Sequence, residues 1–233
     1  MKNFTKILIA AVVAVIAIPS AVRAENKFSV NGKIDFVSDY VWRGAYQGSG
    51  ISVQPSLTLG YAGLTLNAWG NQSLSKDAKE FDINLGYSIK NFTITVSDYW
   101  WSGVDKRYGD YSNDHFFEAS LAYCFGEKVP LTLSWSTMFA GGDKNENGDL
   151  QASTYITASY PFTLPKEIIL TLAVGFTPWK GMYHDKAAVT DVSVKAGKDF
   201  KIGNKFTLPV FVQAIASPAY DRTYLVGGIG FGF

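Results

Sequence analysis

Apolar and polar side chains alternate residue by residue along most of this chain. In the first such stretch, the apolar positions are Phe28, Val30, Ile34, Phe36, Tyr40 and Trp42. The intervening polar positions include Asn31, Lys33, Asp35, Asp39 and Arg43. A period of two places alternate side chains on opposite faces of an extended strand, whereas a helix would repeat about every 3.6 residues. The pattern therefore predicts β-strands.

Alternating stretches of this kind follow one another along the chain, separated by turn residues. They cover residues 28–43, 51–59, 64–68, 81–88, 92–97, 117–125, 131–139, 150–158, 168–176, 192–194, 206–212 and 225–233. Repeated alternating segments are typical of transmembrane β-barrels, and bacterial barrels of this kind have an even number of strands. We predict an all-β fold, a single antiparallel up-and-down transmembrane β-barrel with twelve strands.

The connections between these stretches alternate in length. Short connections fall near residues 61–63, 89–91, 125–130, 160–167 and 200–205. Longer, more polar connections fall near residues 43–50, 70–80, 101–114, 141–149 and 178–187, with 217–221 as a shorter exception. Outer-membrane barrels have short periplasmic turns and long outer loops. We therefore expect both ends of the barrel sequence on the periplasmic side.

Both ends of the sequence carry export signals. Lys2 and Lys6 precede an apolar run over residues 7–18 and small residues up to Ala24, which is the pattern of a secretory signal peptide. The apolar run is shorter than the roughly 20 residues of a membrane-spanning helix. We predict a cleaved signal peptide over residues 1–24 and an outer-membrane β-barrel over residues 25–233. Phe231 and Phe233 end the last strand and resemble the signal read by the barrel-assembly machinery.

Composition narrows the class of protein. Aromatic residues make up 15% of the chain and charged residues only 18%, yet no apolar run after Ala24 is long enough for a membrane helix. A closed barrel is the other way to satisfy backbone hydrogen bonds within lipid. A soluble β-sandwich also alternates, but its water-facing positions should be richer in charge. Without Lys2, Lys6 and Arg23, 18 of the 21 basic residues would remain against 20 acidic ones, so no nucleic-acid partner is expected.

The charges within strands fall on the polar face, which would line the lumen. They are Lys33, Asp35, Asp39, Arg43, Asp82, Glu118, Asp191 and Lys195. A charge facing lipid near the midplane would cost about 2–4 kcal/mol, so membrane placement alone explains this segregation. Rings of charge also tune the ion selectivity of a pore. Five of these residues are acidic and three are basic, which predicts a slight preference for cations.

Small and aromatic residues bear on whether the lumen is open. A twelve-stranded barrel leaves a narrow lumen, which Gly86, Ser88, Ser134, Ser136 and Ser153 would help to keep open. Four aromatic residues are placed to crowd the lumen near the long loops, namely Trp69, Tyr99, Trp101 and Tyr155. They would offer stacking surfaces for a sugar or aromatic solute, or they would pack the rim.

The segment Ser38-Asp39-Tyr40-Val41-Trp42-Arg43-Gly44 stands at the first strand end. We expect Tyr40 and Trp42, together with Trp135, to form an aromatic girdle at the lipid interface. Gly44 would let the chain turn into the first outer loop. The segment, followed by Gln47 and an alternating strand, resembles the opening of the TorF-type porin family over residues 28–72. That resemblance implies an outer-membrane porin and supplies no established functional residues.

A second segment, Ser97-Asp98-Tyr99-Trp100, is similar but has the opposite parity. Its alternation would carry Asp98 to the lipid face with Ile94 and Val96, unless a bulge intervenes.

We expect an outer-membrane channel of a Gram-negative bacterium, resembling a porin, for passive diffusion of small hydrophilic solutes or ions. Its partners would be outer-membrane lipid, the assembly machinery and the solutes, with no cofactor. A non-conducting surface, adhesion or structural barrel is the alternative reading. An outer-membrane hydrolase is a further one, but His115 lies beside Asp114 and His184 beside Asp185, and adjacent strand residues point to opposite faces.

One loop suggests a metal. Asp143, Asn145 and Asn147 match the start of a calcium loop, whose oxygens at alternate positions wrap the ion. The closing position is Thr154 rather than a bidentate glutamate, so a solvated hairpin tip is the competing interpretation.

Overall fold

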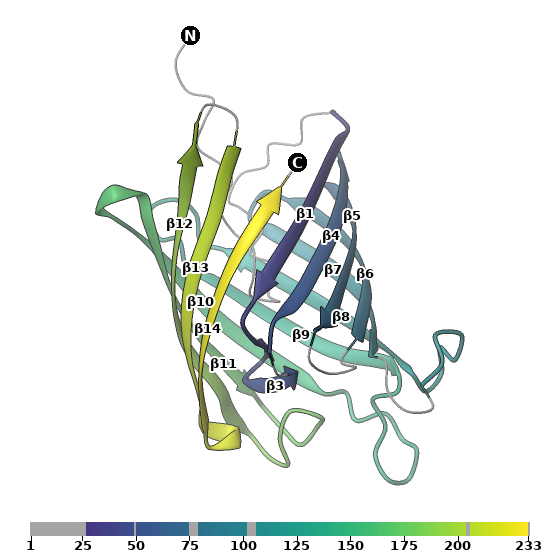
Figure 1. Ribbon diagram of the computed structural model, residues 1–233. Helices are drawn as coiled ribbons and strands as arrows, with labels where there is room; N and C mark the ends of the chain where they lie inside the picture. The colour runs from purple at the N-terminus through teal and green to yellow at the C-terminus, as the bar shows by residue number, and fades with distance from the viewer. Residues whose placement is uncertain (1–26, 49, 75–78, 102–105, 204–205, 233) are drawn as a thin grey trace.

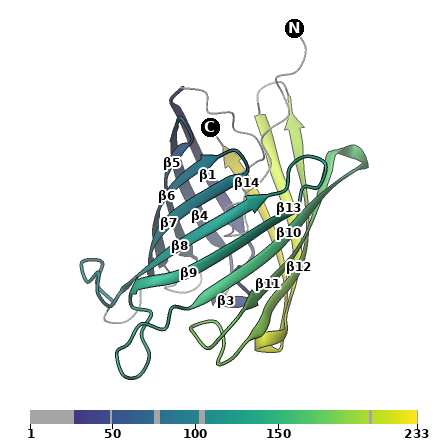
Figure 2. The same cartoon turned by 180° about the vertical axis from the view of Figure 1, so that it is seen from behind.

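The computed structural model describes residues 27–48, 50–74, 79–101, 106–203 and 206–232. Within these ranges, twelve strands close into one antiparallel barrel, in the order β1-β14-β13-β12-β11-β10-β9-β8-β7-β6-β5-β4 (Figures 1 and 2). Their bounds are β1 Ser29–Val37, β4 Ser52–Tyr61, β5 Leu64–Ser73, β6 Lys79–Ile89, β7 Phe92–Trp101, β8 His115–Cys124, β9 Thr132–Gly141, β10 Thr154–Leu164, β11 Ile168–Thr177, β12 Ala188–Ile202, β13 Phe206–Ser217 and β14 Arg222–Gly232. Pairing of β1 with β14, from Lys33 opposite Gly232 to Val37 opposite Gly228, closes the sheet. The predicted barrel and its strand number are confirmed.

The two faces of the barrel wall differ as the alternation predicted. Leu85 and Ile94, on the outer face, are each 53% exposed, whereas Gln54 and Glu118, on the inner face, are each 1% exposed. A soluble protein has the reverse arrangement, with large apolar side chains inside. A continuous apolar exterior around a polar interior is stable only when lipid surrounds the wall, so this is a transmembrane barrel.

The two ends of the barrel differ in their connections. The turn end carries the short connections, such as Ala62-Gly63 between β4 and β5 and the single helical turn η1 (Pro165–Glu167) between β10 and β11. The loop end carries the longer connections and the helical turn η2 (Pro218–Tyr220). Strand β1 starts and β14 ends at the turn end (Figure 1). In the part of the chain that the structure describes, no helix has the length and apolarity needed to cross a membrane.

The chain leaves the barrel wall after β1, which corrects our prediction that the first strand continues to Arg43. Ser38 and Asp39 form a bend, where the Ser38 N–H donates to the Gly227 carbonyl (2.8 Å) and the Gly227 N–H donates to Ser38 Oγ (3.0 Å). Beyond it, β2 (Tyr40–Trp42) and β3 (Ala45–Gly48) pair only with each other. This inner hairpin, residues 40–48, lies within the outline of the barrel at the loop end in both views (Figures 1 and 2).

The bend also overturns the prediction that Tyr40 and Trp42 form part of a lipid-facing girdle. Their side chains are only 7% and 4% exposed, and they lie inside the barrel. Alternation assigns faces only while a strand stays in the wall, and these two residues are no longer in it.

Other predictions concern the outer face and the chain ends. Trp135 is exposed on the outer face, with its ring 5.9 Å from that of Trp179, and its girdle role stays a prediction. Phe231 lies on the outer face between Phe36 and Phe206, at ring distances of 6.0 and 5.8 Å. Phe233 and the predicted signal peptide, residues 1–24, lie outside the described residues.

Candidate functional site

The inner hairpin turns through two residues with left-handed backbone conformations. Arg43 has a φ of 51° and Gly44 a φ of 78°, and Trp42 pairs with Ala45 across them. Positive φ at both central residues matches the type I′ turn that joins tightly paired strands. A Cβ atom at Gly44 would lie 2.3 Å from the Thr190 carbonyl oxygen of β12, so only glycine fits. For Arg43 the same conformation is unfavourable, and its side-chain contacts must offset that cost.

Arg43 forms a buried ion pair across the lumen. Its Nη1 lies 2.5 Å from Oε2 of Glu118, and its Nη2 lies 2.8 Å from Oε1. Glu118, on β8, also accepts hydrogen bonds from the hydroxyls of Tyr99 (3.0 Å) and Ser120 (3.2 Å). This two-pronged pairing of a guanidinium with a carboxylate is among the stronger charged hydrogen-bond arrangements. Since β8 lies across the barrel from β1 and β4, the pair anchors the hairpin to the opposite wall.

Aromatic rings surround the Arg43 guanidinium on its other sides. Its central carbon lies 4.4 Å from the ring of Trp42, 4.6 Å from that of Tyr155 and 5.2 Å from that of Tyr183. Nη1 also donates to the hydroxyl of Tyr183, which lies in the loop between β11 and β12. Burial raises the pKa of the Tyr183 hydroxyl, and Glu118 adds to the rise while Arg43 opposes it. The cation is therefore enclosed by ring faces and a neutral hydroxyl, which favours its position.

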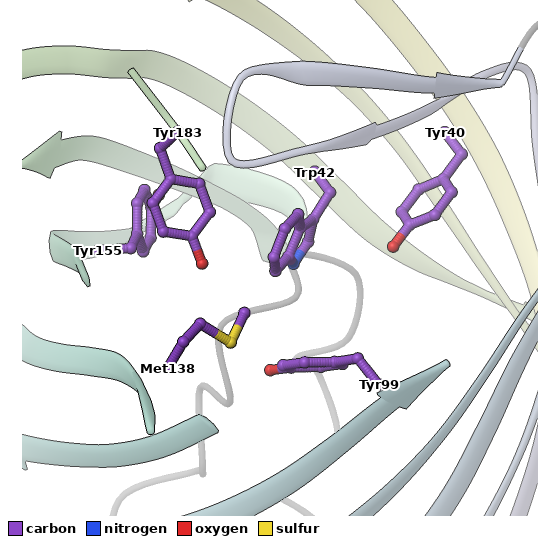
Figure 3. Packing of buried hydrophobic residues seen from close by; sticks show 6 residues of the cluster. All are labelled: Tyr40, Trp42, Tyr99, Met138, Tyr155 and Tyr183. Atoms are coloured by element: carbon purple, nitrogen blue, oxygen red, sulfur yellow. The ribbon is translucent and has the colours of Figure 1, made fainter. Parts of the chain in front are cut away.

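These rings belong to an aromatic cluster that fills the lumen at the loop end. Its buried members are Tyr40, Trp42, Tyr99, Met138, Tyr155 and Tyr183, with Trp69, Trp101 and Phe116 packed against them (Figure 3). In Figure 3, Trp42 projects from the hairpin between Tyr155 and Tyr183 on one side and Tyr40 on the other. Its ring lies 5.8 Å from Tyr99 and 5.6 Å from Trp101. Trp69, Tyr99, Trp101 and Tyr155 thus occupy the region of the lumen predicted for them.

The hairpin is also held against the wall from which it emerges. Tyr46 stacks on Tyr224 of β14, with ring centres 5.7 Å apart and planes 6° from parallel. Val41 packs against a small apolar group in β1, β13 and β14 that comprises Val37, Ile215 and Val226. Contacts on both sides of the lumen therefore keep the hairpin across its mouth.

Carboxylates outnumber cationic groups around this hairpin. Glu80 and Asp82 lie on the inner face of β6 and are buried, at 6% exposure each. Asp191 of β12 accepts a hydrogen bond from the Tyr155 hydroxyl (3.1 Å). Arg43, the cation among them, is already paired with Glu118. The predicted lumen positions of Asp82, Glu118 and Asp191 are therefore the observed ones, and they lie together at the loop end.

The turn end of the lumen is polar and more accessible. Asn67, Asn84 and Ser159 face the interior there and are partly exposed, and the Asn84 amide donates to Asn67 Oδ1 (3.1 Å). Among the predicted charges, Lys33 pairs with Asp35 (2.9 Å), and the Lys195 ammonium lies 4.1 Å from the centre of the Phe211 ring.

Asp39 and Arg43 are the two predicted wall charges that are not in the wall. Asp39 lies at the bend, where it accepts hydrogen bonds from the Tyr46 hydroxyl (2.9 Å) and the Gly50 N–H (3.4 Å). Arg43 reaches the lumen from the hairpin tip. No local pattern could identify its partners, because Glu118 is 75 residues away and Tyr183 is 140 residues away.

The outer face carries a histidine–carboxylate pair that sequence reasoning missed. No register shift interrupts β7 before Asp98, which therefore points outward, as its parity predicted. There Asp98 Oδ1 lies 2.7 Å from Nδ1 of His115, which is fully buried under the loop that carries Tyr108 and Tyr111. Nε2 of His115 lies 2.5 Å from the Tyr108 carbonyl oxygen. Nε2 thus holds the loop and Nδ1 pairs with Asp98 of β7, so neither ring nitrogen is left to serve as a base.

The predicted calcium-loop oxygens are used by their own loop. Asp143, 1% exposed, accepts hydrogen bonds from the N–H (2.8 Å) and hydroxyl (2.5 Å) of Ser153. Asn145 Oδ1 accepts from the N–H groups of Asn147 and Asp149, both at 2.9 Å. Among the residues with described positions, no group of three or more histidine, cysteine, aspartate or glutamate side chains is arranged to hold a metal ion. These contacts favour the hairpin-tip interpretation.

Comparisons with known proteins found similar structures but no family. No family model and no curated protein matched the chain, so the resemblance to the TorF-type family stays a prediction. Solved structures with a similar fold include OmpF of Salmonella typhi in complex with daunomycin, at a TM-score of 0.40 and 10% identity over 89% of this chain and 98% of that one. OprD of Pseudomonas aeruginosa has a TM-score of 0.40 and 10% identity, over 88% of this chain and 66% of OprD. A mutant porin of Rh. blastica has a TM-score of 0.35 and 11% identity, over 89% of this chain and 100% of that porin. At these values the likeness assigns neither family nor function.

Proposed function

We propose that this barrel is an outer-membrane channel that admits small hydrophilic solutes or ions, and that the inner hairpin is the constriction that limits their passage. The observation that carries the proposal is the inner face of the wall. It bears neutral polar side chains, of which Asn67, Asn84 and Ser159 are partly exposed and therefore accessible to water. A polar interior is found in the water-filled channels of porins.

The constriction should favour cations. Glu80, Asp82, Glu118 and Asp191 lie around the hairpin, and Arg43 offsets one of these charges. A cluster of carboxylates in a narrow, poorly solvated passage attracts cations and repels anions. We expect the reversal potential under a potassium chloride gradient to show cation preference, and Glu80→Gln with Asp82→Asn to reduce it. A preference for chloride in the unmodified protein would contradict this assignment.

A planar bilayer tests the proposal. The refolded full chain should give stepwise currents, and a variant in which residues 40–48 are replaced by a short glycine-serine linker should give larger ones. A matched control replaces residues 144–149, a loop-end hairpin tip, in the same way and should leave the step size unchanged. If the unmodified chain is folded but does not conduct, the channel proposal fails, whether or not the hairpin variant conducts.

A non-conducting barrel is the second candidate, and the same hairpin favours it. Tight packing of Tyr40 and Trp42 in the aromatic cluster would close the loop end. In that case the unmodified chain would be silent and the hairpin variant would conduct. The histidines lend no support to a hydrolase. His115 is fully engaged. Nδ1 of His184 does lie 2.9 Å from Oδ1 of Asp185, although adjacent strand residues would point apart, because both residues are in a loop; the Asp185 side chain there is 77% exposed, unlike a buried catalytic pair.

A further inference from the structure

A hollow lies beside the inner hairpin at the loop end of the barrel. Its volume is about 220 Å³. The lining comes from β2, β3, the end of β7, the start of β8, the loop before β12, and η2, with the principal side chains Trp42, Gln47, Trp101, Phe116, Tyr183 and Tyr220. We call this hollow the vestibule. Two of its lining rings, Trp42 and Tyr183, also contact Arg43.

The vestibule is built from ring faces. The ring centres of Trp42 and Trp101 lie 5.6 Å apart and those of Trp42 and Tyr183 lie 5.7 Å apart, both with tilted planes. The rings of Trp101 and Phe116 lie 4.8 Å apart in an edge-to-face arrangement. Hydrogen bonds fix Tyr183 and Tyr220: the Tyr220 hydroxyl donates to the Tyr183 carbonyl oxygen (2.7 Å), and Arg43 Nη1 donates to the Tyr183 hydroxyl. The platform is therefore preorganised, which lowers the entropy that a ligand must lose on binding.

The vestibule has few polar side chains, and none of them is charged. No acidic or basic side chain belongs to the described lining, and the charge of Arg43 behind it is neutralised by Glu118. Gln47 supplies an amide, of which one N–H donates to the Ala45 carbonyl oxygen (3.3 Å). The rest of that amide can give a hydroxyl group both a donor and an acceptor.

We propose that the vestibule binds one neutral sugar ring. The apolar C–H face of such a ring would lie on the aromatic platform, and a hydroxyl on its edge would bond to Gln47. The hollow is smaller than the roughly 300–1,000 Å³ of sites for larger ligands, which limits it to a single ring. This inference rests on the proposed function and narrows the solute class to neutral monosaccharides.

Binding is measured on the refolded full chain in detergent micelles, where no conductance is needed. Tryptophan fluorescence is titrated with glucose, galactose and N-acetylglucosamine, with sorbitol as an open-chain probe of similar hydroxyl content, glucuronate as a charged ring and phenol as an apolar ring. We expect saturable, millimolar binding of at least one neutral sugar, and weaker binding of sorbitol, glucuronate and phenol.

Variants locate the site. Gln47→Ala and Phe116→Leu should each weaken sugar binding at least about tenfold, as truncation of a central contact does. Gln72→Ala is the matched control, because this loop-end glutamine bonds to Ser73 outside the vestibule. Heat-modified migration on gels checks that each variant is folded, and Gln47→Asn, which keeps the amide, should retain part of the binding.

Several outcomes would overturn the inference. They are no saturable binding of any neutral sugar, equal or tighter binding of sorbitol, glucuronate or phenol, and binding that survives both Gln47→Ala and Phe116→Leu. The two proposals fail separately: sugar binding without current would refute the channel alone, and current without sugar binding would refute the vestibule alone.

Discussion

Among the described residues, the wall strands line the lumen at the turn end, and inner side chains such as Asn67, Asn84 and Ser159 remain partly exposed. At the loop end, the same strands carry Glu80, Glu118 and Tyr155, which are almost completely buried. The difference arises from one segment of the chain, the inner hairpin, which leaves the sheet after β1 and crosses the lumen. An identical wall architecture thus gives an accessible compartment or a packed one, according to whether a loop folds into it.

The largest difference between the loop end and the turn end should appear in how much stability is lost when an ion pair is broken. Glu118→Ala leaves the buried Arg43 guanidinium without its partner, which should lower the free energy of unfolding by about 3–5 kcal/mol. Lys33→Gln breaks the Lys33–Asp35 pair at the turn end, where the side chains of Lys33 and Asp35 are 24% and 8% exposed; because glutamine keeps an N–H donor for Asp35, the cost should be smaller, about 1–2 kcal/mol. Urea unfolding in lipid vesicles measures both, and equal losses would contradict the contrast.

A smaller effect is expected at the hairpin tip. Gly44→Ala combines a left-handed backbone with overlap against the Thr190 carbonyl oxygen, and should cost about 2–3 kcal/mol and increase the single-channel current. Gly148→Ala has a similar φ of 84° but no atom within 4 Å of the new methyl group, so about 1 kcal/mol or less is expected. The same unfolding measurement compares the two variants. A Gly44→Ala protein as stable as the Gly148→Ala control would show that the hairpin tip does not pack against Thr190.

The outer face offers a third test, because one loop packs against the outside of the wall as the hairpin packs against its inside. His115→Ala leaves Asp98 without its partner on the apolar face and should cost about 1–2 kcal/mol. His184→Ala, in an exposed loop, should stay within about 0.5 kcal/mol of the unmodified protein. Hydrogen exchange should show that the first substitution releases the loop and the second does not.

The smallest expected effect concerns pH at the same outer loop. Hydrogen bonds from the Arg107 N–H and from Lys106 hold the pKa of Asp114 below its ordinary value. The stabilisation is therefore complete above the ordinary carboxyl pKa of about 3.9, and it is lost as pH falls through the lower folded value. Protection of the Arg107 amide, measured as its exchange rate relative to the intrinsic rate at each pH, should fall only in that acid range. Asp114→Asn should abolish the pH dependence, and an unchanged profile would refute the role of Asp114.

Much of the wall could be predicted from alternation. The inner positions of Asp82, Glu118 and Asp191 follow from parity along their strands, as does the outward position of Asp98. Parity succeeds there because each residue lies in a paired strand, where the pleat alone decides which face a side chain occupies.

The same rule failed where the chain left the sheet. Tyr40 and Trp42 continue the alternation of Phe36, yet a bend at Ser38 and Asp39 turns them into the lumen. Alternation cannot reveal whether a short strand pairs with the wall or with its own return strand. The turn itself was readable, since Gly44 is where a reversal was expected, but the direction of the turn was not.

The sequence by itself determined the barrel, its strand number and the polarity of each face, because these follow from local alternation and from the demand that every backbone group in lipid be paired. Only the tertiary structure decided that the first loop folds inward and that Arg43 meets Glu118 and Tyr183. It likewise decided that His115 pairs with Asp98. These contacts join segments far apart in the chain, and their stability comes from burial and charge pairing that no local pattern encodes.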